Sequence, residues 1–208
     1  MNKVININLG GHALTIDDNA YELLDRYLKR LKRHFQGSVG FENIMQDIEL
    51  RMAELMTENM GNREIASRDD VNKAIETMGQ PEQLTDDSGQ QDSYYTEEGH
   101  YTKREKRLFR DPDNKVISGV CSGLAAYLGI DDPLWIRLLF VASVLFAGFG
   151  VLPYIILWIV MPEAKTSAEK LSMHGEPVNI NSIANKIQED LSDLGRKISD
   201  LGQELRNK

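Results

Sequence analysis

The sequence predicts a mainly α-helical protein with a membrane-embedded segment, and three features of the chain support this. Residues 134–161 are apolar, with no charged side chain between Arg137 and Glu163, long enough for a helix to cross a hydrocarbon layer of roughly 30 Å. Several stretches before this run repeat apolar residues at helical spacing, and residues 182–208 carry a heptad repeat. With a mean hydropathy of -0.38, the remaining chain has little apolar surface to bury so long a run.

Residues 1–84 are predicted to form a small cytosolic domain, a β-hairpin followed by three helices. Residues 3–16 carry apolar positions on both sides of Gly10-Gly11, a pair typical of a tight hairpin turn. Amphipathic helices are predicted from Asp17 or Asp18 to Phe35, from about Glu42 to Asn59, and from Ser67 to Met78. Glycines that follow each of them are helix-ending signals.

The composition and the motifs exclude several classes of function. A net charge of -8 argues against a nucleic-acid-binding protein, so the basic face of the first helix is interpreted as a solvated surface. The single cysteine, Cys121, allows no disulfide within the chain. The four histidines are scattered, and the chain has no HExxH, paired CxxC or Walker motif, so we expect no enzyme activity, metal or cofactor.

Charge changes sign ahead of the apolar run, and this change predicts the topology. Residues 85–102 are acidic and without period, typical of a linker. A basic cluster follows, made of Lys103, Arg104, Lys106, Arg107, Arg110 and Lys115. Because basic residues beside a span stay in the cytoplasm, we expect a membrane protein with its N-terminal domain in the cytoplasm. The N-terminus lacks the apolar core of a signal peptide, so the internal run is expected to direct insertion.

Residues 116–129 are predicted to form a short amphipathic helix at the membrane interface or against a partner. Glycines at 119 and 123 are four residues apart, a spacing that permits close backbone approach to a helix or a membrane surface. We interpret Cys121 as a small packing residue, because no histidine lies close in sequence to activate it. The candidate residues of this helix are Gly119, Val120, Cys121, Gly123, Leu124 and Tyr127.

The apolar run itself is predicted to be a single transmembrane helix with a kink, and a re-entrant helical hairpin is the alternative. The two tryptophans are about 34 Å apart along one helix, which would place one at each interface. Glycines and a proline interrupt the middle of the run and predict the kink. The candidate interface and span residues are Arg107, Arg110, Trp135, Arg137, Gly148, Gly150, Pro153 and Trp158.

After a linker at residues 164–181, the tail of residues 182–208 is predicted to be a coiled-coil helix. Two apolar series recur every seven residues, as at the a and d positions of a heptad. The alternative is an amphipathic helix that lies on a surface. The oligomer seam is predicted to contain Ile187, Leu191, Leu194, Ile198, Leu201 and Leu205.

Residues 106–163 resemble the PspC domain, that of the phage-shock-protein C family of bacterial envelope-stress regulators. The resemblance rests on VISGVCSGLAAYLGIDDPLWIRLLF and on GFGVLPYIILWIVMPE, which keep the order and spacing of the family's motifs within a PspC-like domain at residues 103–163. The resemblance implies an inner-membrane protein that senses envelope damage and signals by binding other proteins. The segment VNKAIETMGQPEQL weakly resembles small cytosolic helical modules of the HAAS type.

These observations together predict a membrane-anchored envelope-stress regulator or adaptor of the PspC type. Its expected partners are proteins of the stress-signalling system, membrane lipids and further copies of itself, with no nucleic acid. Two alternatives remain, a membrane-tethered transcription regulator and a passive oligomer that stabilises the membrane.

Overall fold

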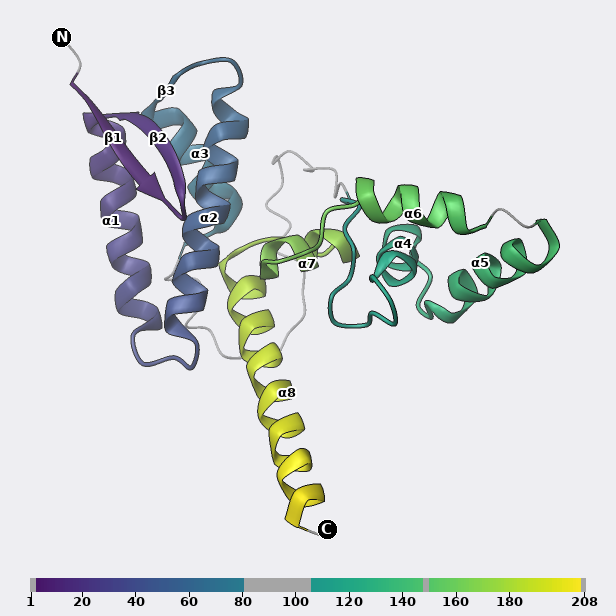
Figure 1. The fold of residues 1–208 in the computed structure, drawn as a ribbon. Coiled ribbons are helices and arrows are strands. Elements are labelled where there is room, and N and C mark those ends of the chain that lie inside the picture. Colours follow the sequence, from purple (N-terminus) through teal and green to yellow (C-terminus); the bar gives the residue numbers. More distant parts are fainter. Residues whose placement is uncertain (1–2, 81–105, 148–149, 207–208) are drawn as a thin grey trace, which may run out of the picture. The chain divides into compact units, whose positions relative to one another are not determined.

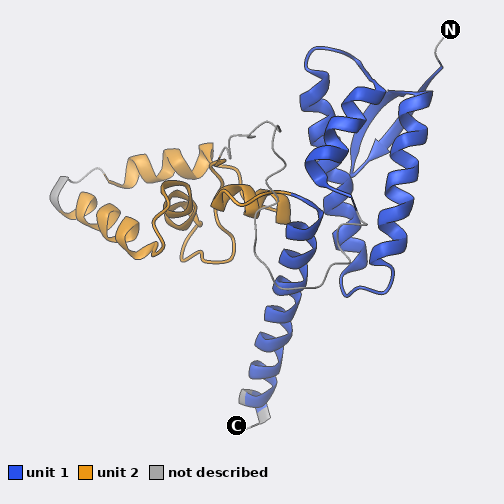
Figure 2. Cartoon of the chain, turned by 180° about the vertical axis from the view of Figure 1, so that it is seen from behind, with its two compact units in different colours: residues 1–92, 179–208 blue, residues 93–178 orange. Residues whose placement is uncertain are grey.

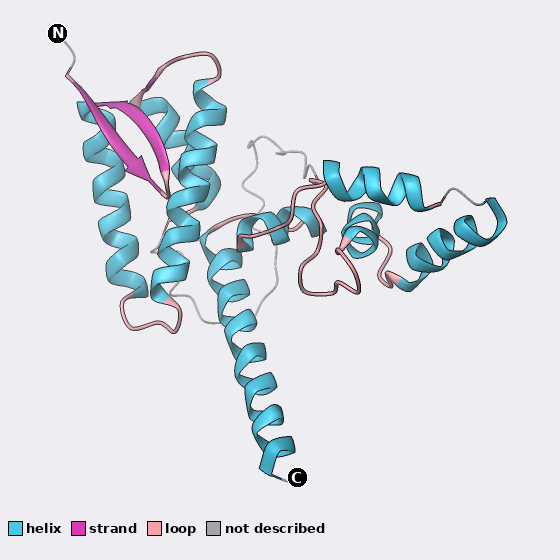
Figure 3. Ribbon diagram, viewed as in Figure 1, coloured by secondary structure: helices cyan, strands magenta, loops and turns pink. Residues whose placement is uncertain are grey.

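The computed structural model describes residues 3–80, 106–147 and 150–206, and the chain divides into two compact units (Figure 2). Residues 1–92 and 179–208 belong to unit 1, and residues 93–178 belong to unit 2. Both units are mainly helical, as the sequence predicts, and the described strands all lie in unit 1 (Figure 3). The predicted acidic linker and the first two cations of the basic cluster lie outside the described residues.

Unit 1 begins with the predicted hairpin. Strand β1 (Val4–Leu9) pairs antiparallel with β2 (His12–Asp17), and Leu9 lies opposite His12 in the register. The turn needs glycine, because Gly10 and Gly11 have φ angles of 56° and 91°. A short third strand, β3 (Ile65–Ala66), pairs in parallel with β2 and gives the order β1-β2-β3.

Three helices form the core of unit 1 together with the sheet: α1 (Asp18–Phe35), α2 (Phe41–Met60) and α3 (Arg68–Met78) (Figure 1). All three were predicted, within two residues at each end. On α1, Tyr27 is fully buried and Tyr21 is exposed. The Tyr27 hydroxyl donates a hydrogen bond of 2.9 Å to the carbonyl of Gly79, which ties α1 to the end of α3. The largest fully buried side chains of this core are Ile16, Leu24, Tyr27, Leu31, Ile44, Ile48, Met52, Met56 and Met78.

The start of α3 is capped by Asp70, a carboxylate that is only 1% exposed. It accepts hydrogen bonds from the Ser67 amide at 2.8 Å, the Ser67 hydroxyl at 2.7 Å and the Arg63 guanidinium at 2.6 Å. Burial raises the pKa of Asp70, but the hydrogen bonds from Arg63 and Ser67 outweigh burial, so the net pKa is below its ordinary value.

We therefore expect unit 1 to lose stability when Asp70 is protonated or removed. Loss of a cap costs about 1 kcal/mol, and loss of a charged hydrogen bond costs about 1.5–3 kcal/mol, so Asp70→Ala is expected to cost roughly 2–4 kcal/mol. Because the folded-state pKa is lowered, the stabilisation is present above the unfolded pKa near 4 and disappears as the pH falls through the folded value. Amide hydrogen exchange of α3 in the full chain measures both effects.

The exposed neighbour Asp69 supplies the control for this prediction. Asp69→Ala removes the same charge but none of the three hydrogen bonds, so α3 is expected to exchange almost as slowly as in the parent chain. If amide exchange of α3 were accelerated equally in Asp70→Ala and Asp69→Ala, the hydrogen bonds of Asp70 would contribute nothing beyond its charge.

Unit 2 contains α4 (Val120–Leu128), α5 (Leu134–Ala147), α6 (Val151–Val160) and α7 (Ser167–His174). Helix α7 lies within the segment that was predicted to be a linker. Its start is a capping box, in which the Thr166 hydroxyl accepts from the Glu169 amide at 3.2 Å and Glu169 accepts from the Thr166 amide at 3.0 Å.

The described residues of the apolar run form two helices, α5 and α6, so the predicted single kinked transmembrane helix is not supported. Helices α5 and α6 have 14 and 10 residues, which correspond to about 21 and 15 Å. Among the described residues, no helix is both long enough and apolar enough to cross a membrane. Pro153 lies in the first turn of α6, where its missing N–H would have no helical partner, so it starts a second helix and does not kink one.

Candidate functional site

The segment before α4 wraps closely around that helix, and two glycines make the contact possible. The amide of Asp111 donates to the carbonyl of Gly119 at 3.1 Å. A Cβ atom on Gly119 would lie 2.2 Å from the carbonyl oxygen of Asp111, and one on Gly123 would lie 1.9 Å from that of Phe109. The predicted close approach is therefore present, but it is made to the preceding segment of the same chain.

Arg110 joins this segment to the end of α6. Its Nε donates to the carbonyl of Met161 at 3.0 Å, its Nη1 donates to the carbonyl of Ser118 at 3.4 Å, and its Nη2 lies 3.8 Å from Glu163. The backbone adds two hydrogen bonds, from the Arg110 amide to Pro162 and from the Ala164 amide to Arg110. The guanidinium therefore ties the end of the apolar run to the segment before α4. Arg107, in contrast, is exposed.

Helices α5 and α6 form a hairpin. The rings of Phe140 on α5 and Tyr154 on α6 meet edge to face with centroids 5.5 Å apart, and the Tyr154 hydroxyl lies 2.7 Å from Ser118 Oγ. Phe140 is about two turns after the start of α5, and Tyr154 is about two turns before the end of α6. The start of α5 and the end of α6 therefore lie at the same end of the hairpin.

The hairpin brings both tryptophans, Trp135 and Trp158, to its base and not to opposite ends of one helix. Arg137, in the first turn of α5, donates from Nη2 to the carbonyl of Asn114 at 2.8 Å. Asp132 accepts from the Leu134 amide at 2.9 Å, so it satisfies one of the free amides at the start of α5. Gly150 lies just before α6, and Gly148 lies outside the described residues.

The hairpin exposes an unusual amount of apolar surface. Helix α6 has no buried residue, and Trp135, Leu145, Ile159 and Val160 are each at least 64% exposed. Patches of this kind in a folded protein mark a surface that contacts a membrane or another protein. The exposed apolar surface consists of Leu134, Trp135, Leu138, Leu139, Val141, Val144, Leu145, Val151, Leu152, Ile155, Ile156, Trp158, Ile159 and Val160.

Helix α4 packs inside unit 2, so only part of the predicted interfacial helix is exposed. Val120 and Gly123 are buried, Cys121 and Leu124 are half-buried, and Tyr127 is exposed. Burial raises the pKa of the Cys121 thiol, and the nearby charge of Arg137 only partly opposes it. A raised pKa keeps the thiol protonated, which agrees with the interpretation of Cys121 as a packing residue.

The predicted oligomer seam lies on α8 (Ile180–Arg206), and the structure divides it into two parts. The first part packs against α2 of the same chain, where Ile187 is buried and Leu191 is half-buried. The second part continues the same stripe into solvent, and Cβ atoms built on Gly195 and Gly202 would contact nothing within 4 Å. The exposed part of the seam consists of Leu194, Ile198, Leu201 and Leu205.

Sequence reasoning missed two features of the site. One is the buried carboxylate of Asp111, which accepts from the amides of Asp113 and Asn114; the sequence Asp-Pro-Asp-Asn is a turn signal that could have indicated it. The other is the set of contacts that Lys106 and Arg137 make around α4, which no local pattern encodes. Within the part of the chain that the structure describes, no group of three or more His, Cys, Asp or Glu side chains could hold a metal ion.

Comparison with known proteins identifies the segment that contains this hairpin. Residues 106–164 match the PspC domain family, as the resemblance in the sequence implied. The match covers the segment before α4, helices α4 to α6 and the contacts of Arg110, and it points to a phage-shock-type stress-response protein. No curated protein and no solved structure matches the chain.

Proposed function

We propose that this protein is a membrane-anchored regulator of the envelope-stress response that acts by binding other proteins and not by catalysis. The observation that carries the proposal is the exposed apolar surface of α5 and α6, which lies within the segment that matches the PspC domain. Such a surface in contact with water is costly, and burial in lipid removes that cost.

In this proposal the hairpin enters one leaflet of the inner membrane from the cytoplasmic side. Both tryptophans are at its base, where indole rings favour the interface, and the basic residues Lys106, Arg107 and Lys115 are in the segment before α4. The chain therefore returns to the side from which it entered. Unit 1 remains in the cytoplasm and offers a surface to a protein partner.

The proposed signal is a change in the lipid around the hairpin. A ligand or a membrane state can shift an equilibrium only by the difference in its free energy of interaction with the two conformations. Here the two conformations differ in how well the hairpin and α4 pack at the interface between membrane and water. Damage to the membrane would change that packing and so shift the affinity for the partner.

The exposed part of the α8 seam supports self-association as a second element of the proposal. A monomer gains nothing from four large apolar side chains in solvent at heptad spacing, whereas a second helix would bury them. The glycines Gly195 and Gly202 each weaken an isolated helix by about 1 kcal/mol, and association with another helix would offset that cost.

Flotation with lipid vesicles tests the membrane proposal. The full chain, mixed with phosphatidylcholine vesicles in a density gradient, is expected to rise with the lipid and to remain bound after an alkaline carbonate wash. A chain that stays at the bottom of the gradient in a folded, monodisperse state would contradict the proposal.

A further inference from the structure

Unit 2 contains an open cavity of about 730 Å³ beside the base of the hairpin. Its walls come from the loop before α4, the second half of α4 and the first turn of α5. Three cations, from Lys106, Lys115 and Arg137, line it together with His174. All these residues belong to unit 2, so the cavity lies within one compact part of the chain.

Two of these cations are held in place by backbone carbonyls. Lys106 Nζ donates to Ala126 at 3.1 Å, at the end of α4, and Arg137 Nη2 donates to Asn114 at 2.8 Å. Among the described residues, Lys106 uses one of its three ammonium N–H groups in these contacts, and Arg137 uses one of its five guanidinium N–H groups. The cavity therefore presents positioned cationic donors, which is what a phosphate group requires.

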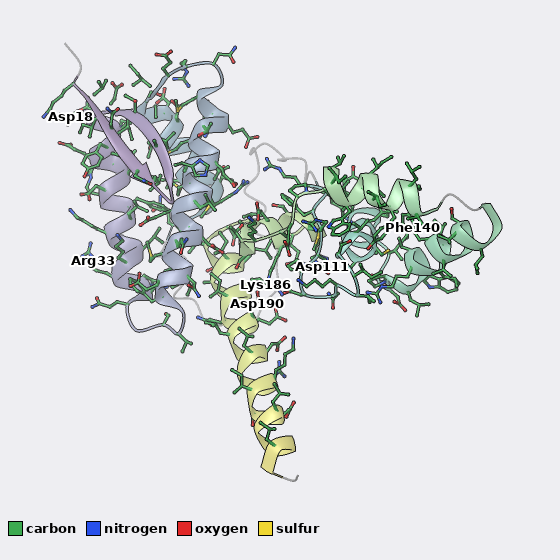
Figure 4. The ribbon with its side chains drawn as sticks, viewed as in Figure 1. Asp18, Arg33, Asp111, Phe140, Lys186 and Asp190 are labelled. Carbon is green, nitrogen blue, oxygen red and sulfur yellow. The ribbon has the colours of Figure 1, made fainter. Side chains whose placement is uncertain are left out.

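Among the described residues, the carboxylates that line the cavity do not pair with Lys106 or Arg137, whereas Lys115 lies 3.9 Å from Glu163. Asp111 accepts from the amides of Asp113 and Asn114 and from Asn114 Nδ2, at 2.9–3.3 Å, so its oxygens are satisfied within the loop. Asp113 is paired with Lys170 at 2.8 Å. Only Asp131 lines the cavity without such a contact among the described residues. Figure 4 shows Asp111 in the loop that leads into α4.

An apolar stripe starts at the cavity and runs along α5. Leu134, Leu138, Val141 and Leu145 follow one another at helical spacing, and each is more than half exposed. Arg137 lies on the same face, between the first and third of these residues, so its cation is at the head of the stripe. A free phosphate would use the donors alone, whereas a lipid would use both the donors and the stripe.

We propose that this cavity binds the phosphate of an anionic phospholipid, with the acyl chains along the exposed stripe of α5. Lys115 and Arg137 donate to the phosphate, and Lys106 adds charge at the rim. This inference rests on the proposed membrane association and deepens it, since it gives the hairpin a specific lipid in addition to general burial in a bilayer.

The test is a titration of the full chain, in nonionic detergent, with short-chain dihexanoyl phosphatidylglycerol. Trp135, two residues before Arg137, supplies the fluorescence signal. The double variant Lys115→Gln/Arg137→Gln removes two donors from the cavity. The control Arg107→Gln/Lys165→Gln removes two exposed charges of the same unit that do not line the cavity. The cavity variant is expected to lose at least tenfold more affinity than the control.

Each other outcome of the titration has a definite meaning. Equal losses in the two double variants would show general charge attraction and would overturn the site. Competition by glycerol phosphate at the same concentration as the lipid would show a free-phosphate site and would overturn the assignment to a lipid. Because the titration needs no bilayer, it also separates this inference from the proposed function. A chain that fails to float with phosphatidylcholine vesicles but still binds the short-chain lipid would contradict only membrane anchoring.

Discussion

Replacing Leu138 and Ile156 by aspartate is expected to release the protein from phosphatidylcholine vesicles without unfolding it. The two side chains are 54% and 52% exposed, one on each helix of the hairpin, so neither contributes to the packed interior of unit 2. Transfer of a charged side chain into the bilayer costs about 2.5–3.5 kcal/mol on the most conservative scale, so two charges correspond to a loss of binding of more than a thousandfold. The fraction of protein that floats with the vesicles measures the effect.

A matched control separates loss of lipid contact from loss of structure. The control Lys165→Asp lowers the net charge by two, as the double variant does, but at an exposed position outside the hairpin. It is expected to float like the parent chain. Flotation of the Leu138/Ile156 variant to the same extent would mean that the exposed apolar surface does not contact lipid.

Aspartates at Leu194 and Ile198 are expected to abolish self-association through α8. The structure confines the available seam to the residues after Leu191, since the earlier positions pack on α2. A buried charge without a partner costs several kcal/mol, more than a helix of this length gains from its intrinsic propensity. Crosslinked oligomer is expected to disappear, while unit 1 stays folded because both side chains are exposed in the single chain.

The control for α8 places the same charges on its other face. Ser199→Asp/Gln203→Asp adds two aspartates at exposed positions outside the seam and is expected to leave the oligomer intact. In a Cys121→Ser background, Leu194→Cys is expected to form a symmetric disulfide if two helices run parallel. Failure to crosslink at every exposed seam position, together with labelling of the same face by lipid probes, would place α8 on the bilayer.

The elements of unit 1 were predictable because their signals are local. Gly10-Gly11 specifies the hairpin turn, and Ser67 with Asp70 forms a capping box although aspartate replaces the usual glutamate or glutamine. Strand β3 was not predictable in this way, because two residues carry no alternating pattern and its position depends on pairing with β2.

The hairpin of unit 2 depends on contacts between residues far apart in sequence. Both a kinked span and a hairpin agree with an apolar run broken by Gly150 and Pro153, so the pattern alone left both open. The hairpin is stabilised over the single span by the ring contact between Phe140 and Tyr154 and by the hydrogen bonds of Arg110 to the chain at the end of α6.

Helix α7 could have been predicted from the sequence, because Thr166 and Glu169 form a capping box of the usual residue types.

The most direct test of membrane anchoring by a hairpin is the side of the membrane on which its two ends lie. Lys115→Cys and Lys165→Cys, each in a Cys121→Ser background, place one thiol at an exposed position before the hairpin and one after it. A membrane-impermeant maleimide is added to intact spheroplasts and to inverted inner-membrane vesicles. The hairpin predicts that both thiols react in the inverted vesicles and neither in the spheroplasts. Reaction of Lys165→Cys in the spheroplasts, with Lys115→Cys reacting only in the inverted vesicles, would contradict it.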